Sequence, residues 1–119
     1  SELVVSFGVG LLRSKFLNRC SSKIINIHRG IATSYRGLDS DLWAIYNHDF
    51  SNIGVTLHYV DEMLDTGSIV KSASLVRSPD MEIYHIRFWT TLMATDMLLS
   101  VLKSLGTLEP QVQKNFGKY

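Results

Sequence analysis

Two short apolar runs near the start of the chain restrict its architecture most. Leu3–Phe7 is a partly β-branched run stopped by Gly8, and Ile24–Ile27 is a second run rich in isoleucine. Both have the length and composition of buried strands. The segment from Leu11 to Arg19 between them has weak helical spacing of its apolar residues. A strand, a helix and a strand in this order predict a parallel βαβ unit, and so an α/β fold with a mostly parallel sheet.

The second of these runs also carries polar side chains. Asn26 and His28 alternate with isoleucines, so both leave the same face of the strand. In parallel sheets ligands collect at the carboxyl ends of the strands, where Phe7 and His28 would meet. A plainer interpretation stays open, in which His28 only bonds a loop carbonyl at the strand end.

A helix and a pair of strands are expected in the middle of the chain. Asp39–Tyr46 reads as a helix whose apolar face consists of Leu38, Leu42, Ile45 and Tyr46. Gly54–Val60 and Ser68–Val76 alternate as strands do, and the loop between them ends in glycine. We expect these two strands to pair as a wide hairpin.

The last regular element predicted is a long helix. Ser78, Pro79 and Asp80 form a strong helix start, and Gly106 ends the helix after about Leu105. A stripe at helical spacing runs along it, and we expect this stripe to pack in the core: Tyr84, Phe88, Leu92, Thr95, Leu99 and Leu102.

Composition limits the classes of partner. The 119 residues suffice for one domain, and a net charge of +1 argues against nucleic acid or an anionic membrane as a partner. A single cysteine, Cys20, excludes an internal disulfide and fits a reducing compartment. No two of the four histidines and Cys20 have the spacing of metal ligands, so no metal is expected. Both ends of the chain are abrupt, and we expect a fragment of a longer protein.

Several further polar and glycine residues have two interpretations each. Asp65 can act as a catalytic carboxylate or only cap its own turn. Arg29 and Arg36 can hold a phosphate or be solvated. Gly8 and Gly10 can let the backbone approach a flat ligand closely, or serve a plain turn.

Four motifs in a fixed order carry a resemblance to a known family. They are Asn26-Ile27-His28, Tyr35-Arg36-Gly37, the strand Gly54–Val60 with His58, and Leu64-Asp65-Thr66-Gly67. In this order the chain, from about Val4 to Leu105, resembles the formyltransferases that use 10-formyltetrahydrofolate. These include the methionyl-tRNA, glycinamide ribonucleotide and sugar N-formyltransferases. The resemblance implies that residues 1–119 are the carboxyl half of one Rossmann-like catalytic domain, with a hairpin and a long C-terminal helix.

The resemblance also assigns roles to individual residues. It implies a catalytic set of Asn26, His28 and Asp65. It implies a folate-binding set of Phe7, Gly8, Val9, Gly10, Leu11, Leu12, Leu64 and Asp65. Arg29, Tyr35 and Arg36 would lie beside the amine substrate, and His58 would orient the loop that carries Asp65. The segment Arg29–Tyr35 departs from the family, since it lacks the usual proline-containing run after the histidine.

The function implied is transfer of a formyl group from 10-formyltetrahydrofolate to an amine. We expect a nucleotide-linked amino sugar as acceptor, with methionyl-tRNA or glycinamide ribonucleotide as alternatives. An inactive module that binds folate or a nucleotide, and an unrelated α/β interaction domain, stay open as other classes. We expect a cytoplasmic protein that binds folate and a small-molecule amine. We expect no membrane partner and no nucleic-acid partner, and the oligomeric state stays open.

Overall fold

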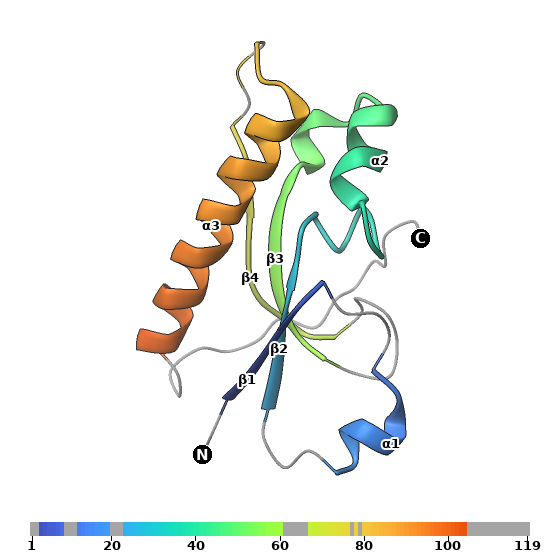
Figure 1. The fold of residues 1–119 in the computed structure, drawn as a ribbon, viewed down its shortest axis with the longest axis vertical. Coiled ribbons are helices and arrows are strands. Elements are labelled where there is room, and N and C mark those ends of the chain that lie inside the picture. The colour runs from blue at the N-terminus through green and yellow to red at the C-terminus, as the bar shows by residue number, and fades with distance from the viewer. Residues whose placement is uncertain are drawn as a thin grey trace.

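The computed structural model describes residues 3–8, 12–19, 23–60, 67–76, 78 and 80–104. Four strands form one sheet in the order β1-β2-β3-β4 (Figure 1). They are β1 (Leu3–Phe7), β2 (Lys23–His28), β3 (Gly54–Tyr59) and β4 (Ile69–Ser74). Strands β1 and β2 are parallel, and the short helix α1 (Ser14–Leu17) lies between them in the chain. The predicted βαβ unit and the α/β class are therefore confirmed.

The expectation of a mostly parallel sheet is wrong for these four strands. Strand β3 is antiparallel both to β2 and to β4. The connection from β2 to β3 contains α2 (Ser40–Tyr46) and the 3-10 turn η1 (Phe50–Asn52). Both lie near the carboxyl end of β2 (Figure 1). Because this connection does not carry the chain back along the sheet, β3 starts where β2 stopped and runs the other way. The predicted hairpin of β3 and β4 is confirmed, with an irregularity between Leu57 and His58.

Helix α3 (Ile83–Lys103) begins later than the Ser78-Pro79-Asp80 pattern predicted. The Met81 N–H donates to the Ser78 carbonyl, and Asp80 lies in a turn before the helix. Glu82 caps the helix instead: its side chain accepts from the first turn, and its own backbone N–H donates to Nδ1 of His85 at 3.1 Å. The helix starts later because this reciprocal cap forms at Glu82, four positions after Ser78.

The apolar face that α3 buries is not the predicted one. The helix buries Ile86, Thr90, Ala94, Met97 and Val101. The C-terminal half of the helix packs against Ile25, Val55 and Leu57 of the sheet. The apolar members of the predicted stripe are 43% to 68% exposed, from Leu102 to Tyr84. Apolar residues occur all around this helix, so periodicity does not select a face. The face with small side chains such as Ala94 and Thr90 lets the helix approach the sheet closely.

Helix α2 is turned only partly toward its expected face: Leu42 and Ile45 are half-buried, and Ile45 packs against the apolar cluster that contains Ala44. It buries Ser40, Asp41 and Ala44, whereas Leu38 and Tyr46 are 67% and 75% exposed. Two of the buried polar groups have partners: Ser40 donates to the Gly37 carbonyl, and Oδ1 of Asp41 pairs with Arg87 of α3, whereas Oδ2 of Asp41 has no hydrogen-bond partner among the described residues. These contacts determine the rotation of α2.

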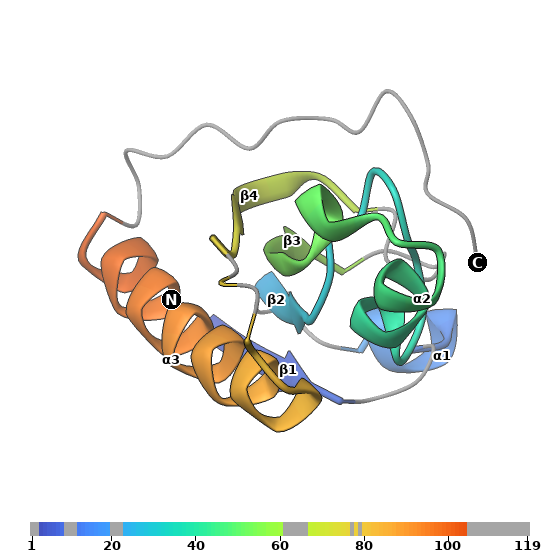
Figure 2. The same cartoon turned by 90° about the horizontal axis from the view of Figure 1, so that it is seen from above.

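Figure 2 shows α3 on one side of the strands and α1 and α2 on the other. Strand β3 is buried from Gly54 to His58, because it lies between two strands and is covered on both faces. A second apolar cluster lies near α2 and contains Tyr35, Ala44, Ile53 and Ile86. Among the described helices, none is both long and apolar enough to cross a membrane.

Candidate active site

A row of polar side chains crosses three strands on one face of the sheet. The strand register places Ser6 of β1 beside Asn26 of β2, and Asn26 beside His58 of β3. Ser6 Oγ donates to Asn26 Oδ1 at 2.8 Å, and Asn26 Nδ2 lies 3.2 Å from His58 Nε2. The alternation of β2 thus brings Asn26 into a hydrogen-bonded row near the strand's carboxyl end.

The hydrogen bonds of His58 define the orientation of the Asn26 amide. His58 Nδ1 lies 3.0 Å from the Tyr59 carbonyl oxygen, which can only accept, so Nδ1 carries the proton. Nε2 is then the acceptor of a proton from Asn26 Nδ2. Because Ser6 donates to Oδ1 and Nδ2 donates to His58, the positions of the oxygen and the nitrogen of the Asn26 amide are defined.

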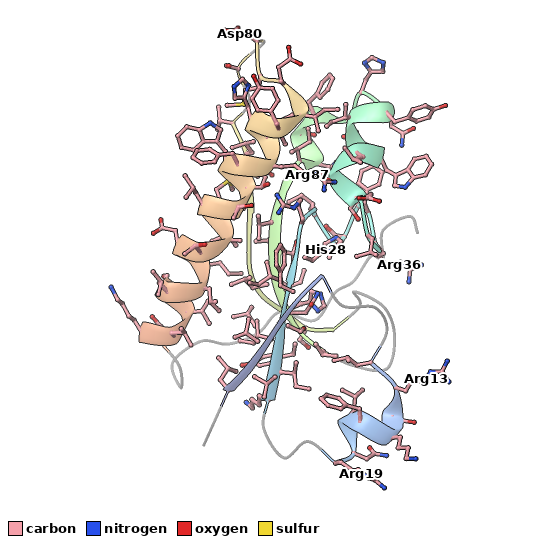
Figure 3. All side chains as sticks on the ribbon, viewed as in Figure 1. Arg13, Arg19, His28, Arg36, Asp80 and Arg87 are labelled. Carbon is pink, nitrogen blue, oxygen red and sulfur yellow. The ribbon has the colours of Figure 1, made fainter. Side chains whose placement is uncertain are left out.

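His28 lies two residues further along the same face of β2. Its side chain is 4% exposed, and its ring centroid lies 6.4 Å from that of His58, at an interplanar angle of 65°. Nε2 of His28 is 2.9 Å from the Tyr35 carbonyl oxygen, so this nitrogen carries a proton. Asn26, His28 and His58 therefore form one cluster, and Figure 3 shows where His28 lies in it.

The loop after His28 is held close to the ring by backbone contacts. A Cβ on Gly30 would lie 2.9 Å from His28 Nε2 and 2.6 Å from Ser40 Cβ, so a larger residue would push against both. Thr56 Oγ1 donates to the Gly30 carbonyl at 2.7 Å and accepts from the Ala32 N–H at 3.1 Å. Strand β3 in this way anchors the loop that covers His28.

The three predicted substrate residues have different surroundings. Tyr35 is 5% exposed, and its hydroxyl donates to Asp49 at 3.0 Å; burial, followed by this bond, raises the pKa of the phenol. The Arg29 guanidinium bonds to α3, as described below, whereas Arg36 is half-buried and lies at the outer edge near α2 (Figure 3). Contact of any of the three with a substrate stays a prediction.

The predicted folate residues are only partly described. Phe7 is 51% exposed, and a Cβ on Gly8 would meet no atom within 4 Å. An open backbone beside an exposed ring fits the approach of a flat ligand. Leu12 is half-buried. Five of the positions, among them the catalytic candidate Asp65, lie outside the described residues, and their roles stay predictions: Val9, Gly10, Leu11, Leu64 and Asp65.

Gly67, the last residue of the predicted Asp65 loop, lies against the site. A Cβ there would stand 1.6 Å from the Tyr59 carbonyl oxygen and 3.5 Å from His58 Nδ1. Only glycine fits, because the obstacle is backbone. The chain therefore re-enters the sheet directly beside His58.

An ion-pair cluster beside the site escaped sequence analysis. Arg87 of α3 reaches toward α2 (Figure 3) and contacts Asp41 at 2.9 Å and Asp39 at 3.1 Å. Burial lowers the pKa of Arg87, but its contacts with Asp39 and Asp41 outweigh this and raise it overall. Asp41 is 1% exposed, a surrounding that a carboxylate tolerates only when paired. Partners 46 positions apart leave no signal in a single sequence.

Ser6 was also missed, because a serine in an apolar strand reveals its role only when the register of the neighbouring strand is known.

A model of the family described as Formyl transferase matches residues 2–83. The chain belongs to the formyltransferase family. A phosphoribosylglycinamide formyltransferase of Haemophilus influenzae is 35% identical over 86 residues, which are 71% of this chain and 40% of that protein. A methionyl-tRNA formyltransferase of Finegoldia magna is 26% identical over 100 residues, 84% of this chain and 32% of that protein. This formyltransferase chain thus spans two fifths or less of these two relatives.

Solved structures share the fold of the formyltransferase chain. The formyltransferase PseJ of Anoxybacillus kamchatkensis superposes with a TM-score of 0.86 at 22% identity, over 98% of this chain and 63% of that one. A 4-N formyltransferase of Francisella tularensis gives a TM-score of 0.84 at 21% identity, over 98% and 48%. The Rossmann-like α/β fold expected for the chain is confirmed.

Proposed function

We propose that the protein carrying this chain transfers a formyl group from 10-formyltetrahydrofolate to the amine of a nucleotide-linked amino sugar. The observation that carries the proposal is the placement of Asn26 and His28 on one face of β2, with the amide oriented by His58. Membership in the formyltransferase family supports the same chemistry.

In the proposed reaction, the amine nitrogen attacks the formyl carbon and the carbonyl oxygen becomes negative. The Asn26 N–H and protonated His28 would donate to this oxygen, and each preorganised donor contributes about 2.7–4 kcal/mol. Nε2 of His28 already donates to the Tyr35 carbonyl, so Nδ1 would carry the second proton of the imidazolium. Tyr35 in this way orients the ring while the other nitrogen serves the reaction.

We assign the proton transfer to Asp65, which stands two residues before Gly67 in the sequence. Its carboxylate would take the proton that the attacking amine loses, directly or through one water. The oxyanion then re-forms the carbonyl, the bond from the formyl carbon to the folate nitrogen breaks, and that nitrogen leaves with the proton that Asp65 took from the amine. The negative charge of Asp65 would also favour protonated His28.

The choice of donor and acceptor is supported by what is bound in structures of similar fold. PseJ was solved with a UDP-linked formamido sugar and tetrahydrofolate, and WlaRD, a sugar 3N-formyl transferase, with dTDP and 5-N-formyl-tetrahydrofolate. Glycinamide ribonucleotide and methionyl-tRNA are the second candidates, because the two curated relatives act in those classes by name. The reducing cytoplasm is the location we expect.

The test offers 10-formyltetrahydrofolate and each acceptor class in turn to the full protein. We expect release of tetrahydrofolate and a formylated product with an amino sugar linked to UDP or dTDP. The variants Asp65→Asn and His28→Asn should still bind folate but lose most turnover. His48→Asn is the matched control, since His48 is exposed after α2 and its φ of 54° suits asparagine. Folate binding without transfer to any acceptor would instead favour the inactive binding module.

A further inference from the structure

The Arg29 side chain joins three separate parts of the fold. One guanidinium nitrogen donates to the Arg87 carbonyl at 2.8 Å and to Thr90 Oγ1 at 2.7 Å, and the other donates to Thr91 Oγ1 at 3.0 Å. The same guanidinium lies 5.7 Å from the centroid of the Phe7 ring, within cation–π range. Arg29 itself directly follows His28 and the end of β2.

These contacts suit arginine better than lysine. A planar guanidinium directs several N–H donors at fixed angles, whereas the ammonium group of lysine is a single compact centre. Here two nitrogens meet three acceptors within about one turn of α3, on Arg87, Thr90 and Thr91. The guanidinium is therefore held in one orientation, and the backbone that joins His28 to Gly30 is held with it.

Helix α3 also connects to α2, on the side of His28 where Ser40 lies. The Arg87 side chain bonds Asp41 and Asp39 at the start of α2, and Ser40 between them packs against Gly30 next to the His28 ring. The burial of Arg29 lowers the pKa of its guanidinium, the charge of Asp41 opposes this effect, and that of Arg87 adds to it. The guanidinium groups of Arg29 and Arg87 thus lie with the carboxylates of Asp39 and Asp41 beside the histidine loop.

We propose that Arg29 is a positioning residue for formyl transfer, which ties His28 and the Phe7 ring to α3 and does not bind the acceptor. This inference rests on the proposed function. Arg29 would then affect the rate of the chemical step, because it acts by holding His28 in place. A residue that clamps a substrate phosphate would instead act on the affinity for the acceptor.

The kinetic test separates the two roles. In the full protein, Arg29→Met should lower kcat on the order of 10–100-fold, the effect of a small misplacement of a reacting group, and leave the KM of the acceptor nearly unchanged. Arg29→Lys should restore a part of kcat. A rise in the acceptor KM at unchanged kcat would overturn the proposal.

A double-mutant cycle tests the connection to α3. The pair Thr90→Val and Thr91→Val removes two acceptors of Arg29 without touching a substrate, so it should lower kcat and add little to Arg29→Met. Thr95→Val is the matched control, because its hydroxyl bonds only the Thr91 carbonyl on the exposed side of the same helix. Full additivity of the losses would contradict the shared role.

A readout independent of turnover separates this inference from the proposed function. In protein with ¹⁵N-labelled histidine, the Nε2 proton of His28 should be protected by the Tyr35 carbonyl, and Arg29→Met should shift and expose it. This result would support the positioning role even if no acceptor were formylated. An unchanged His28 resonance together with unchanged kcat would overturn it.

Discussion

Asn26 and His58, 32 positions apart in the chain, meet through a hydrogen bond of 3.2 Å between Nδ2 and Nε2. The bond has a direction, because the Tyr59 carbonyl holds the proton of His58 on Nδ1. A histidine that reacts would need a ring nitrogen directed at the substrate. In His58 the bond to Tyr59 fixes the tautomer, and the bond to Asn26 orients the amide. Its predicted effect on the loop that carries Asp65 stays a prediction.

Replacing His58 should therefore reduce catalysis through Asn26. We expect His58→Phe to lower kcat on the order of tenfold, and Asn26→Ala on the order of 10²–10³-fold, the loss seen for one oxyanion donor. Steady-state formyl transfer measures both. In the Asn26→Ala background, His58→Phe should have little further effect; a full second loss would mean that His58 acts on the substrate itself.

Gly67 should tolerate no side chain. A Cβ would overlap the Tyr59 carbonyl oxygen at 1.6 Å, so Gly67→Ala must displace the end of the β3–β4 hairpin. We expect a loss of about 3 kcal/mol or more in the free energy of unfolding, measured with urea. Gly8→Ala is the comparison: Gly8 has a left-handed φ of 72°, which Gly67 lacks, but it has open space around it, and the substitution should cost about 1–2 kcal/mol. Equal losses would refute the steric explanation.

The two faces of α3 should respond differently to truncation. Val101 is 1% exposed against the sheet, whereas Leu99 on the opposite stripe is 52% exposed. Val101→Ala should destabilise by about 2 kcal/mol, and Leu99→Ala by less than about 1 kcal/mol. Urea unfolding of both variants measures the difference. A loss at Leu99 as large as that at Val101 would reveal that another part of the full protein covers this stripe.

Tyr35 should make the fold sensitive to alkali. Burial and the bond to Asp49 raise the pKa of its phenol, so the folded state keeps the proton that the unfolded chain loses near pH 10, roughly the usual value for tyrosine. The stabilising effect is complete below that pH and is lost as the pH rises through the folded-state pKa. Tyr35→Phe should flatten the fall of the urea midpoint above about pH 10. Tyr46→Phe, at a residue 75% exposed, should leave the slope unchanged.

Short-range patterns were sufficient for much of this fold. The βαβ unit, the hairpin and the presence of a long helix follow from strand alternation, glycine stops and helical spacing, which act within a few residues. The same period of two puts Asn26 and His28 on one face. The ordered motifs from Asn26 to Gly67 were also enough to indicate the formyltransferase family, which the family match confirms.

Contacts between distant segments decided the rest. The direction of β3 depends on where the connection through α2 and η1 brings the chain back to the sheet. The buried face of α3 depends on which side chains let the helix approach the sheet. Ser6, Asn26 and His58 join only through the strand register, and Arg29 turns to α3 because Thr90 and Thr91 stand within reach of its guanidinium. Tertiary packing and the need to pair buried polar groups determine which of these residues meet. The local spacing of residues in the sequence does not contain this information.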